Sequence, residues 1–221
     1  MDVTIGSEFR SKDVNVTLGT MVFSVSPPIG TGAAQTALDD LAQQLTPRLE
    51  AAKPAEFPSI ATTRKAYRAL GKDPGRYRPS SEALLRRVAA GKPLPQINNV
   101  VDAGNVISLS NDLSLGAYNA SQIVGPVSFR RAADGETAQA IGRGVMNFEH
   151  LPVFADDRGP FGSPTSDTER TMVTPDAQNI LMVLIAFEKD EAMARRLDAA
   201  SDLLKAICQA DALKTAIVKN W

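Results

Sequence analysis

The chain has very little cysteine, histidine or tryptophan. Its 221 residues include one of each, Cys208, His150 and Trp221. A single cysteine excludes an intrachain disulfide. One cysteine and one histidine argue against a zinc site, because such sites draw on several of these ligands. We therefore expect no metal and no structural disulfide, and the low cysteine content favours a cytoplasmic location.

Long apolar runs are also absent. No stretch approaches the roughly 20 apolar residues that cross a bilayer. Residues 1–6 lack the basic stretch followed by an apolar one that marks a secretory signal. Hydrophobic residues make up 43% of the chain and charged residues 22%, as in soluble globular proteins. We expect a cytoplasmic protein without a membrane partner.

The net charge of −1 conceals a basic segment at residues 64–92. Asp73 and Glu82 are its only acids, against nine cations, so the segment carries +7 and the rest of the chain −8. One interpretation is a face that binds a polyanion. The candidate residues for this contact are Arg68, Lys72, Arg76, Arg78, Arg86 and Arg87. The alternative is a solvated, arginine-rich helical hairpin.

Hydrophobic periodicity predicts both helices and strands. In the first half it predicts strands over residues 3–9 and 14–25, a helix over 37–52 capped by Thr36, and a helix over 59–70 ended by Gly71. Ser80 or Ser81 is expected to cap the next helix, and a short helix over 97–103 is expected to lead into a strand over 106–109.

The second half is predicted to be mainly β before a helical end. Strands are expected over residues 125–130, 153–155, 172–174 and 180–187. The last of these is a continuous apolar run, which is typical of a strand buried on both faces. A helix follows from about Met193, and a second short helix is expected over 211–218.

Residues 159–171 are the strongest candidate for a functional loop. The thirteen residues read Gly-Pro-Phe-Gly-Ser-Pro-Thr-Ser-Asp-Thr-Glu-Arg-Thr. Such a run of Gly, Pro and short polar residues is not expected to form a buried strand. It is also longer than the usual connection of about 4–6 residues, and long ordered loops are often functional. The alternative is a solvated turn.

Several segments resemble the B3/B4 domain of the bacterial phenylalanyl-tRNA synthetase β subunit. They lie in the family's order between residues 66 and 188, a little over half of the chain. They are residues 67–74, 78–87, 100–105, 125–136, 153–156 and 173–182, in which Gly125-Pro-Val-Ser-Phe-Arg-Arg-Ala-Ala-Asp-Gly-Glu136 is similar to the family's Gly-x-Ile-x-Val-Arg-x-Ala-x-x-Gly-Glu. As a whole, the chain is more similar to free-standing B3/4-domain proteins, which carry no synthetase body.

The resemblance implies an α+β fold in which a layered β-sandwich of unusual topology is flanked by helices. It also implies one domain over 1–221, made of N-terminal strands and a helix (1–58), a B3/4 core (59–188) and C-terminal helices (189–221). In the synthetase this domain hydrolyses tyrosine from mischarged tRNA and needs no cofactor. The implied function is therefore editing of aminoacyl-tRNA, an ester hydrolysis, or binding of the tRNA 3′ end. The resemblance makes RNA the expected polyanion, so the six basic candidates become RNA-binding candidates and no DNA partner is expected.

Two departures from the synthetase pattern affect the predicted substrate. The synthetase has a His after its Leu-x-Leu-Gly, whereas here Leu113-Ser-Leu-Gly116 leads to Tyr118 and Asn119. Where the synthetase follows its glycine pair with a Glu, this chain has Ser163 and an insertion. The substrate is therefore not expected to be tyrosyl-tRNA(Phe). A non-catalytic protein that binds an amino acid or similar metabolite is the alternative, and a protein-interaction module is a third reading.

Ester hydrolysis requires a positioned water and groups that stabilise an oxyanion. Asp167 is the candidate that orients the water, with Ser163 as a second catalytic candidate. The substrate-binding candidates are Tyr118, Asn119, Glu136, Thr165, Ser166, Thr168 and Arg170. In the alternative reading Asp167 and the hydroxyls cap turns within the loop, Arg170 pairs with Asp156 or Asp157, and Glu136 satisfies backbone donors of its turn. His150 and Cys208 are expected to be structural rather than catalytic.

Overall fold

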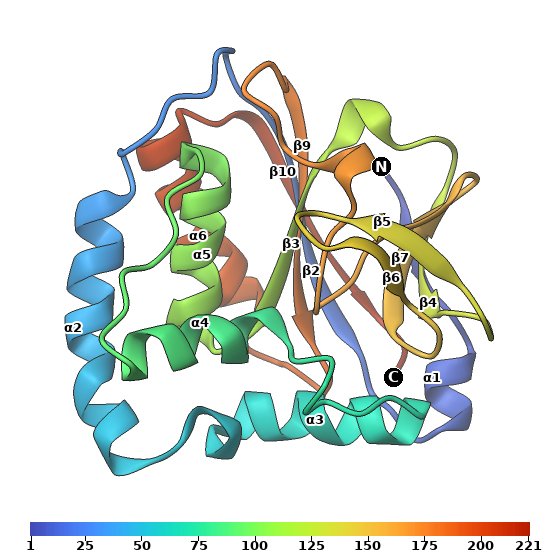
Figure 1. Ribbon diagram of the computed structural model, residues 1–221. Coiled ribbons are helices and arrows are strands. Elements are labelled where there is room, and N and C mark those ends of the chain that lie inside the picture. Colours follow the sequence, from blue (N-terminus) through green and yellow to red (C-terminus); the bar gives the residue numbers. More distant parts are fainter.

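The computed structural model describes all residues from 1 to 221 (Figure 1). Its helices are α1 (Glu8–Ser11), α2 (Gln35–Ala51), α3 (Pro58–Leu70), α4 (Ser80–Ala89), α5 (Asn99–Asn111) and α6 (Met193–Cys208). Its strands are β1 (Val3–Ile5), β2 (Thr17–Ser24), β3 (Ser114–Asn119), β4 (Val127–Arg131), β5 (Thr137–Ala140), β6 (Gly144–Asn147), β7 (Pro152–Asp156), β8 (Gly159–Gly162), β9 (Asn179–Ala186) and β10 (Asp211–Lys219). Short 3₁₀ turns occupy Pro54–Glu56, Ala120–Gln122 and Glu169–Thr171.

The strands form two four-stranded sheets and a hairpin. The central sheet has the order β10-β2-β9-β3, the second sheet has the order β1-β4-β7-β8, and β5 pairs with β6 alone. Only the β1–β4 pair is parallel. In Figure 1 the central sheet lies between a helical layer, with α2, α4, α5 and α6, and the second sheet, while α3 runs across one end. The predicted α+β sandwich flanked by helices is confirmed.

Strand β9 separates the two hydrophobic cores. Its side chains alternate: Leu181, Val183 and Ile185 face the core between the sheets, while Met182 and Leu184 face the core under α5 and α6. Since side chains alternate across a strand, a strand buried on both faces must be apolar throughout. The prediction for residues 180–187 is confirmed.

Helix α5 replaces the short helix and the strand that were expected over residues 97–109. It begins after Asn98, whose side chain accepts a hydrogen bond from the N–H of Val101 at 3.0 Å. Val100, Ala103 and Ile107 share one face and pack into the core under the central sheet. The strand prediction at 106–109 is wrong because this packing outweighs the weak β preference of Val106 and Ile107.

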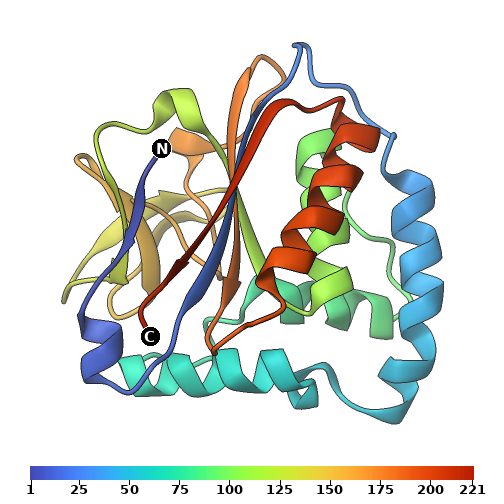
Figure 2. The same cartoon turned by 180° about the vertical axis from the view of Figure 1, so that it is seen from behind.

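The end of the chain forms a strand where a second helix was predicted. Helix α6 stops at Gln209, which has a left-handed φ of 51°. Strand β10 then pairs antiparallel with β2 along residues 211–219 (Figure 2). An isolated helix of eight residues is marginal, whereas the open edge of β2 offers a full set of hydrogen-bond partners. The prediction of C-terminal helices over 189–221 is therefore wrong after Cys208.

Smaller predictions fail at the ends of elements. The first strand stops at Ile5, and residues 8–11 are helical. Residues 172–174 are not part of any strand. Neither Thr36 nor Ser80 or Ser81 is an N-cap: Ala34 and Pro79 occupy those positions, with no side-chain cap. The Gly71 prediction is confirmed, since it ends α3 with a left-handed φ of 93°.

The N- and C-terminal segments are built into the same sheets as the middle of the chain. Strand β2 lies between β10 and β9, and β1 pairs with β4. We therefore propose that residues 1–221 form one domain. None of the helices combines the length and the apolar character that crossing a bilayer requires.

Candidate functional site

Segment 159–171 is largely buried. Its first four residues form β8, which pairs with β7 and buries Phe161. The expectation that the whole run avoids a strand is wrong there, because β7 has an open edge and Gly159, with a φ of 104°, allows the tight turn before β8. Ser163, Thr165 and Thr168 are also buried, so a solvated turn is wrong too.

The hydroxyl groups of this segment hold its own backbone. The Ser163 hydroxyl accepts hydrogen bonds from the N–H groups of Thr165 and Ser166, at 3.2 and 3.0 Å, and donates to the Ser166 carbonyl. Thr168 donates to the Phe161 carbonyl at 2.9 Å. These contacts are the turn-stabilising alternative stated for the hydroxyls. Ser163 has no histidine beside it.

Asp167 is the one acid of the segment that faces a cavity. It is half-buried, and its Oδ1 accepts a hydrogen bond from the Tyr118 hydroxyl at 3.0 Å. Burial raises the pKa of the Asp167 carboxyl to about 7, although Tyr118 and the backbone N–H groups of Ser163 and Ala117 oppose the rise. Burial and the Asp167 charge also raise the pKa of Tyr118, so its hydroxyl stays protonated and donates. The carboxyl is therefore half-ionised near neutral pH.

Two glycines create the space for the Tyr118 side chain. Tyr118 lies in β3, fully buried, with its ring edge-on to Phe154 and Phe161. A Cβ atom at Gly116 or at Gly162 would overlap the Tyr118 hydroxyl. Local sequence thus fixes the position of the hydroxyl that holds Asp167.

Asp167 opens onto an apolar cavity of about 240 Å³. The walls come from α4, α5, β3, the β5–β6 turn and the chain before β9. The lining residues are Ser80, Leu84, Ile97, Val101, Gly104, Asn105, Ser108, Leu115, Ala117, Ile141, Asp167, Met172 and Val173. Eight of these are hydrophobic and Asp167 is the only ionisable one, so the cavity, called the apolar chamber below, presents one carboxyl among mostly apolar walls.

A second hollow, of about 440 Å³, shares part of the wall of the apolar chamber. Ser80, Leu84 and Asn105 line both. The lining of this second hollow contains four arginines and no acid, and we call it the arginine cleft. Its lining residues are Gly75, Arg76, Arg78, Ser80, Ala83, Leu84, Arg87, Asn105, Arg143 and Thr165. Such a concentration of guanidinium groups favours the binding of phosphate groups.

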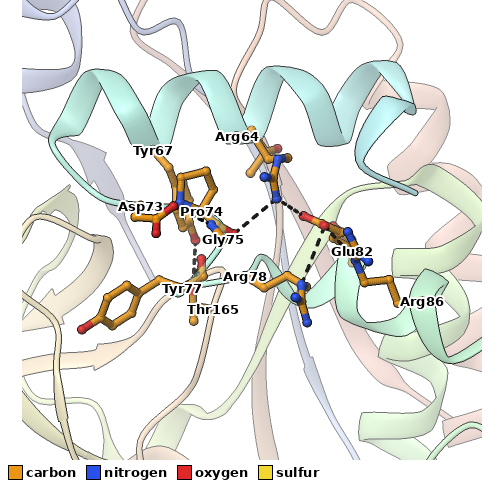
Figure 3. Close-up of polar contacts among 12 residues, drawn as sticks. Arg64, Tyr67, Asp73, Pro74, Gly75, Tyr77, Arg78, Glu82, Arg86 and Thr165 are labelled. Atoms are coloured by element: carbon orange, nitrogen blue, oxygen red, sulfur yellow. Dashed lines mark hydrogen bonds and ion pairs between the residues drawn. The ribbon is translucent and has the colours of Figure 1, made fainter. Parts of the chain in front are cut away.

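Glu82 forms ion pairs with three arginines of the basic segment. Its carboxylate is fully buried and lies 2.8 Å from Arg64, 2.9 Å from Arg86 and 3.7 Å from Arg78. Figure 3 shows these three guanidinium groups converging on Glu82 from α3, α4 and the turn between them. A buried carboxylate needs such partners. Arg78, at the rim of the arginine cleft, is thereby held in place.

Thr165 connects the arginine cleft to the core. Its hydroxyl lies 2.9 Å from the Tyr67 hydroxyl and donates to the Tyr77 carbonyl (Figure 3). Ser166 is half-buried beside it and lines neither hollow.

Three other predicted substrate-binding residues are engaged within the chain and line neither hollow. Arg130 forms a two-fold contact with Glu136, at 2.7 and 2.8 Å, and holds the pKa of that carboxyl below its ordinary value. Glu136 also accepts from the Ala133 N–H, its expected turn role. Arg170 binds Asp156 through two contacts of 2.9 Å. The Asn119 side chain accepts from the Ser121 N–H.

The predicted RNA-binding residues divide into three groups. Arg76, Arg78 and Arg87 come together in the arginine cleft, while Arg68 and Arg86 are exposed outside it. Lys72 is buried: its ammonium group donates to the Glu149 carbonyl at 2.5 Å and lies over the Tyr77 ring.

His150 lies away from both hollows. Its Nε2 is 2.7 Å from an oxygen of Asp134, and Glu149 completes a group whose ligand atoms lie within 4.8 Å of one another. The hydrogen bond from His150 lowers the pKa of Asp134. These are the residues with metal-ligand spacing, but Asp134 is 84% exposed and the group has the form of a hydrogen-bonded surface cluster.

Sequence reasoning missed Arg143, Asn105 and the apolar lining. Arg143 lies outside the basic segment, in the β5–β6 turn, and only the fold carries it to the arginine cleft. Asn105 belongs to residues 100–105, which resemble the family's sequence but carry no pattern that predicts a site role. No local signal marks a residue as lining a cavity between distant segments.

Comparisons with known proteins match the B3/4 domain family, whose model covers residues 62–209. No curated protein matches the chain. The solved structure of an N-terminal fragment of the phenylalanyl-tRNA synthetase β-subunit from Pyrococcus horikoshii is similar to it at 14% identity, with a TM-score of 0.47 over 99% of this chain. The chain spans about half, 51%, of that fragment. Because the family model covers more than half of its residues, this protein belongs to the B3/4 domain family.

Proposed function

We propose that this B3/4-domain protein binds the 3′ end of an acylated tRNA and hydrolyses the ester that joins the amino acid to the terminal ribose. The observation that carries this proposal is the pairing of two hollows. An apolar chamber with one carboxyl, Asp167, shares a wall with a cleft lined by four arginines. An aminoacyl-tRNA end has matching parts: an acyl group, an ester and a chain of phosphates.

The arginine cleft suits the phosphates near the RNA end. Guanidinium groups bind phosphate oxygens in pairs and remain charged at every physiological pH. Arg76, Arg87 and Arg143 are exposed and line the cleft with no competing acid. Contacts of this kind position the RNA without reading its sequence.

In this proposal the ester lies at the shared wall, beside Ser80 and Asn105. Water attacks the carbonyl carbon while Asp167 accepts one of its protons, giving a tetrahedral intermediate with one negative oxygen. The Asn105 amide and the Ser80 hydroxyl are the donors near that oxygen. The bond to the ribose oxygen then breaks, and Asp167 returns the proton to that oxygen. The products are the free amino acid and the tRNA 3′-hydroxyl.

The chemistry of Asp167 supports its role as the base. An effective general base has a pKa near the working pH, and burial raises the pKa of Asp167 to about 7. The Tyr118 hydroxyl donates to Oδ1 and so fixes the orientation of the carboxyl beside the chamber. Positioning and proton transfer are sufficient for this reaction because an aminoacyl ester is already activated.

Single-turnover hydrolysis tests the proposal. Total tRNA, charged with a mixture of labelled amino acids, is incubated with the wild type, with Asp167→Asn and with Asp198→Asn, the same change at an exposed position of α6. We expect the wild type and Asp198→Asn to release at least one amino acid, and Asp167→Asn to release it about 100-fold more slowly or not at all. Equal rates for the wild type and Asp167→Asn would remove Asp167 from the chemistry.

Binding without catalysis is the second candidate. The engagement of Ser163, Glu136 and Arg170 within the chain favours it, because it leaves fewer free polar groups for a reaction. The ligand is then a free amino acid or similar metabolite in the apolar chamber. Thermal unfolding with free amino acids and nucleosides separates the two candidates. Stabilisation by a free amino acid, without hydrolysis of any aminoacyl-tRNA, supports the second.

A further inference from the structure

Exposed apolar side chains gather at the mouth of the apolar chamber. Seven large hydrophobic residues of the chain are exposed, and three of them, Ile97, Ile141 and Met172, line this one cavity. They are 57%, 44% and 39% exposed, respectively, and come from three separate segments. An apolar rim assembled from distant segments is typical of a surface that a ligand covers.

The interior of the chamber offers no cation to an anionic group and no ring for an aromatic group to stack on. Its lining contains no Lys, Arg or His, and its only ionisable side chain is Asp167, which already accepts from Tyr118. No aromatic ring lines it. A carboxylate placed here would lose its hydration without gaining a cationic partner, and an ammonium group would find only Asp167, the carboxyl proposed to accept the proton of the water. Aliphatic groups would fill the space, with a favourable transfer from water that grows with each buried CH₂.

We infer that the apolar chamber receives the uncharged, aliphatic side chain of the acyl group, and that Ile97, Ile141 and Met172 close over it. This inference rests on the proposed function, because it places the ester at the shared wall and directs the side chain away from the arginine cleft. The substrate class is then tRNA carrying an aliphatic amino acid. The terminal adenine is the competing occupant, and it would make binding independent of the acyl group.

Gly104 and Leu115 set the depth of the chamber. Gly104 lies in α5 and lines the cavity, and a Cβ atom at this position would lie 3.0 Å from Cδ2 of Leu115. That distance is shorter than ordinary van der Waals contact, so an alanine here adds a methyl group at the chamber wall and displaces Leu115, which lines the chamber as well. Gly104→Ala should therefore shift preference toward smaller acyl groups, and Leu115→Ala toward larger ones. One methylene in such a pocket changes affinity by roughly 10-fold or more.

The test uses CCA trinucleotides whose 3′ amide-linked amino acid cannot be hydrolysed. Calorimetry compares valine, leucine and methionine analogues with lysine, glutamate and tryptophan analogues and with the unacylated 3′-amino trinucleotide. We expect the tightest aliphatic analogue to bind about 10-fold more tightly than any of the others. Equal or tighter binding of charged or aromatic analogues overturns the inference, and so does an affinity that is the same with and without the acyl group. Neither result contradicts the proposed binding of RNA phosphates in the arginine cleft. No binding of any analogue overturns the proposed function as well.

A matched pair of variants tests the rim. Ile141→Ser removes a rim residue, and Val145→Ser makes a similar change on the same hairpin at a residue that is 74% exposed and outside the cavity. Both positions are exposed, so both variants should fold. Ile141→Ser is expected to weaken binding of the aliphatic analogue about fivefold and to leave binding of the unacylated trinucleotide unchanged. Val145→Ser should change the affinity for neither. Equal effects of the two variants, or no effect of either, would contradict the inference.

Discussion

Replacing Asp167 with asparagine should alter how the stability of the protein depends on pH. Asparagine keeps the size of the side chain and can still accept the Tyr118 hydrogen bond, but it never ionises. In the unfolded chain an aspartate has a pKa of about 3.9. In the fold the pKa of Asp167 is about 7. The folded value is the higher one, so the carboxyl favours the fold in acid, and that stability is lost as the pH rises through about 7.

The magnitude follows from the width of this window. Each pKa unit corresponds to about 1.4 kcal/mol, and most of the titration between the two pKa values falls above pH 5. Between about pH 5 and pH 8 the wild type should therefore lose about 2–3 kcal/mol of unfolding free energy relative to Asp167→Asn. Any cost of the asparagine amide itself is the same at both pH values and cancels in this difference.

Urea unfolding of both proteins at the two pH values measures this difference directly. Asp198→Asn, at an exposed site, serves as the control and should track the wild type. Other carboxyls titrate alike in all three proteins and drop out of the comparison. A difference between wild type and Asp167→Asn that changes by less than about 0.5 kcal/mol would refute the reasoning, because Asp167 would then be an ordinary acid and not a base poised near neutrality.

Three further predictions concern the groups around the site. Tyr118→Phe removes the donor to Asp167 and should destabilise the fold by about 1–2 kcal/mol. Because this hydrogen bond lowers the pKa of Asp167, its loss should move the pH midpoint of hydrolysis upward by about one unit. An unchanged midpoint would show that Tyr118 does not act on the catalytic carboxyl. Changing Arg76, Arg87 and Arg143 together to Ala should weaken tRNA binding and reduce the slope of log affinity against log salt concentration by about 2. The same loss of charge at three exposed positions outside the cleft, Arg195, Lys205 and Lys214, should have little effect. Equal slopes for the two triple variants would show that the arginine cleft is only a solvated surface. Glu82→Gln leaves three arginines facing a neutral amide and should lower the free energy of unfolding, measured with urea, by roughly 3 kcal/mol. A loss under about 1 kcal/mol would show that solvent already screens the charges of this cluster.

Much of the fold was predictable because its elements have strong local patterns. The apolar run of β9 indicates burial on both faces, and Gly71 marks the end of α3. Residues 97–109 and 211–218 were misassigned because their local preferences are weak. In both places distant partners decide the structure: the core under the central sheet for α5, and the open edge of β2 for β10.

The candidate site was predictable only in part. Residue types alone singled out Asp167 and three of the arginines of the cleft. They could not show that the Ser163 hydroxyl holds a turn or that Arg170 is paired with Asp156. The walls of the apolar chamber come from five parts of the chain, so the chamber is a property of the tertiary fold. Asp167 acquires its raised pKa from that burial and not from its sequence neighbours.

The pH dependence of hydrolysis tests the central claim most directly. The measurement is the single-turnover rate of ester hydrolysis, at saturating protein, on the aminoacyl-tRNA that the protein cleaves best. If Asp167 accepts the proton of the attacking water, the rate rises with pH through a midpoint of about 7 and then levels off, after subtraction of the uncatalysed rate. The same midpoint in Asp167→Asn, or an enzyme-dependent rate that does not change between about pH 5 and pH 8, would contradict the account.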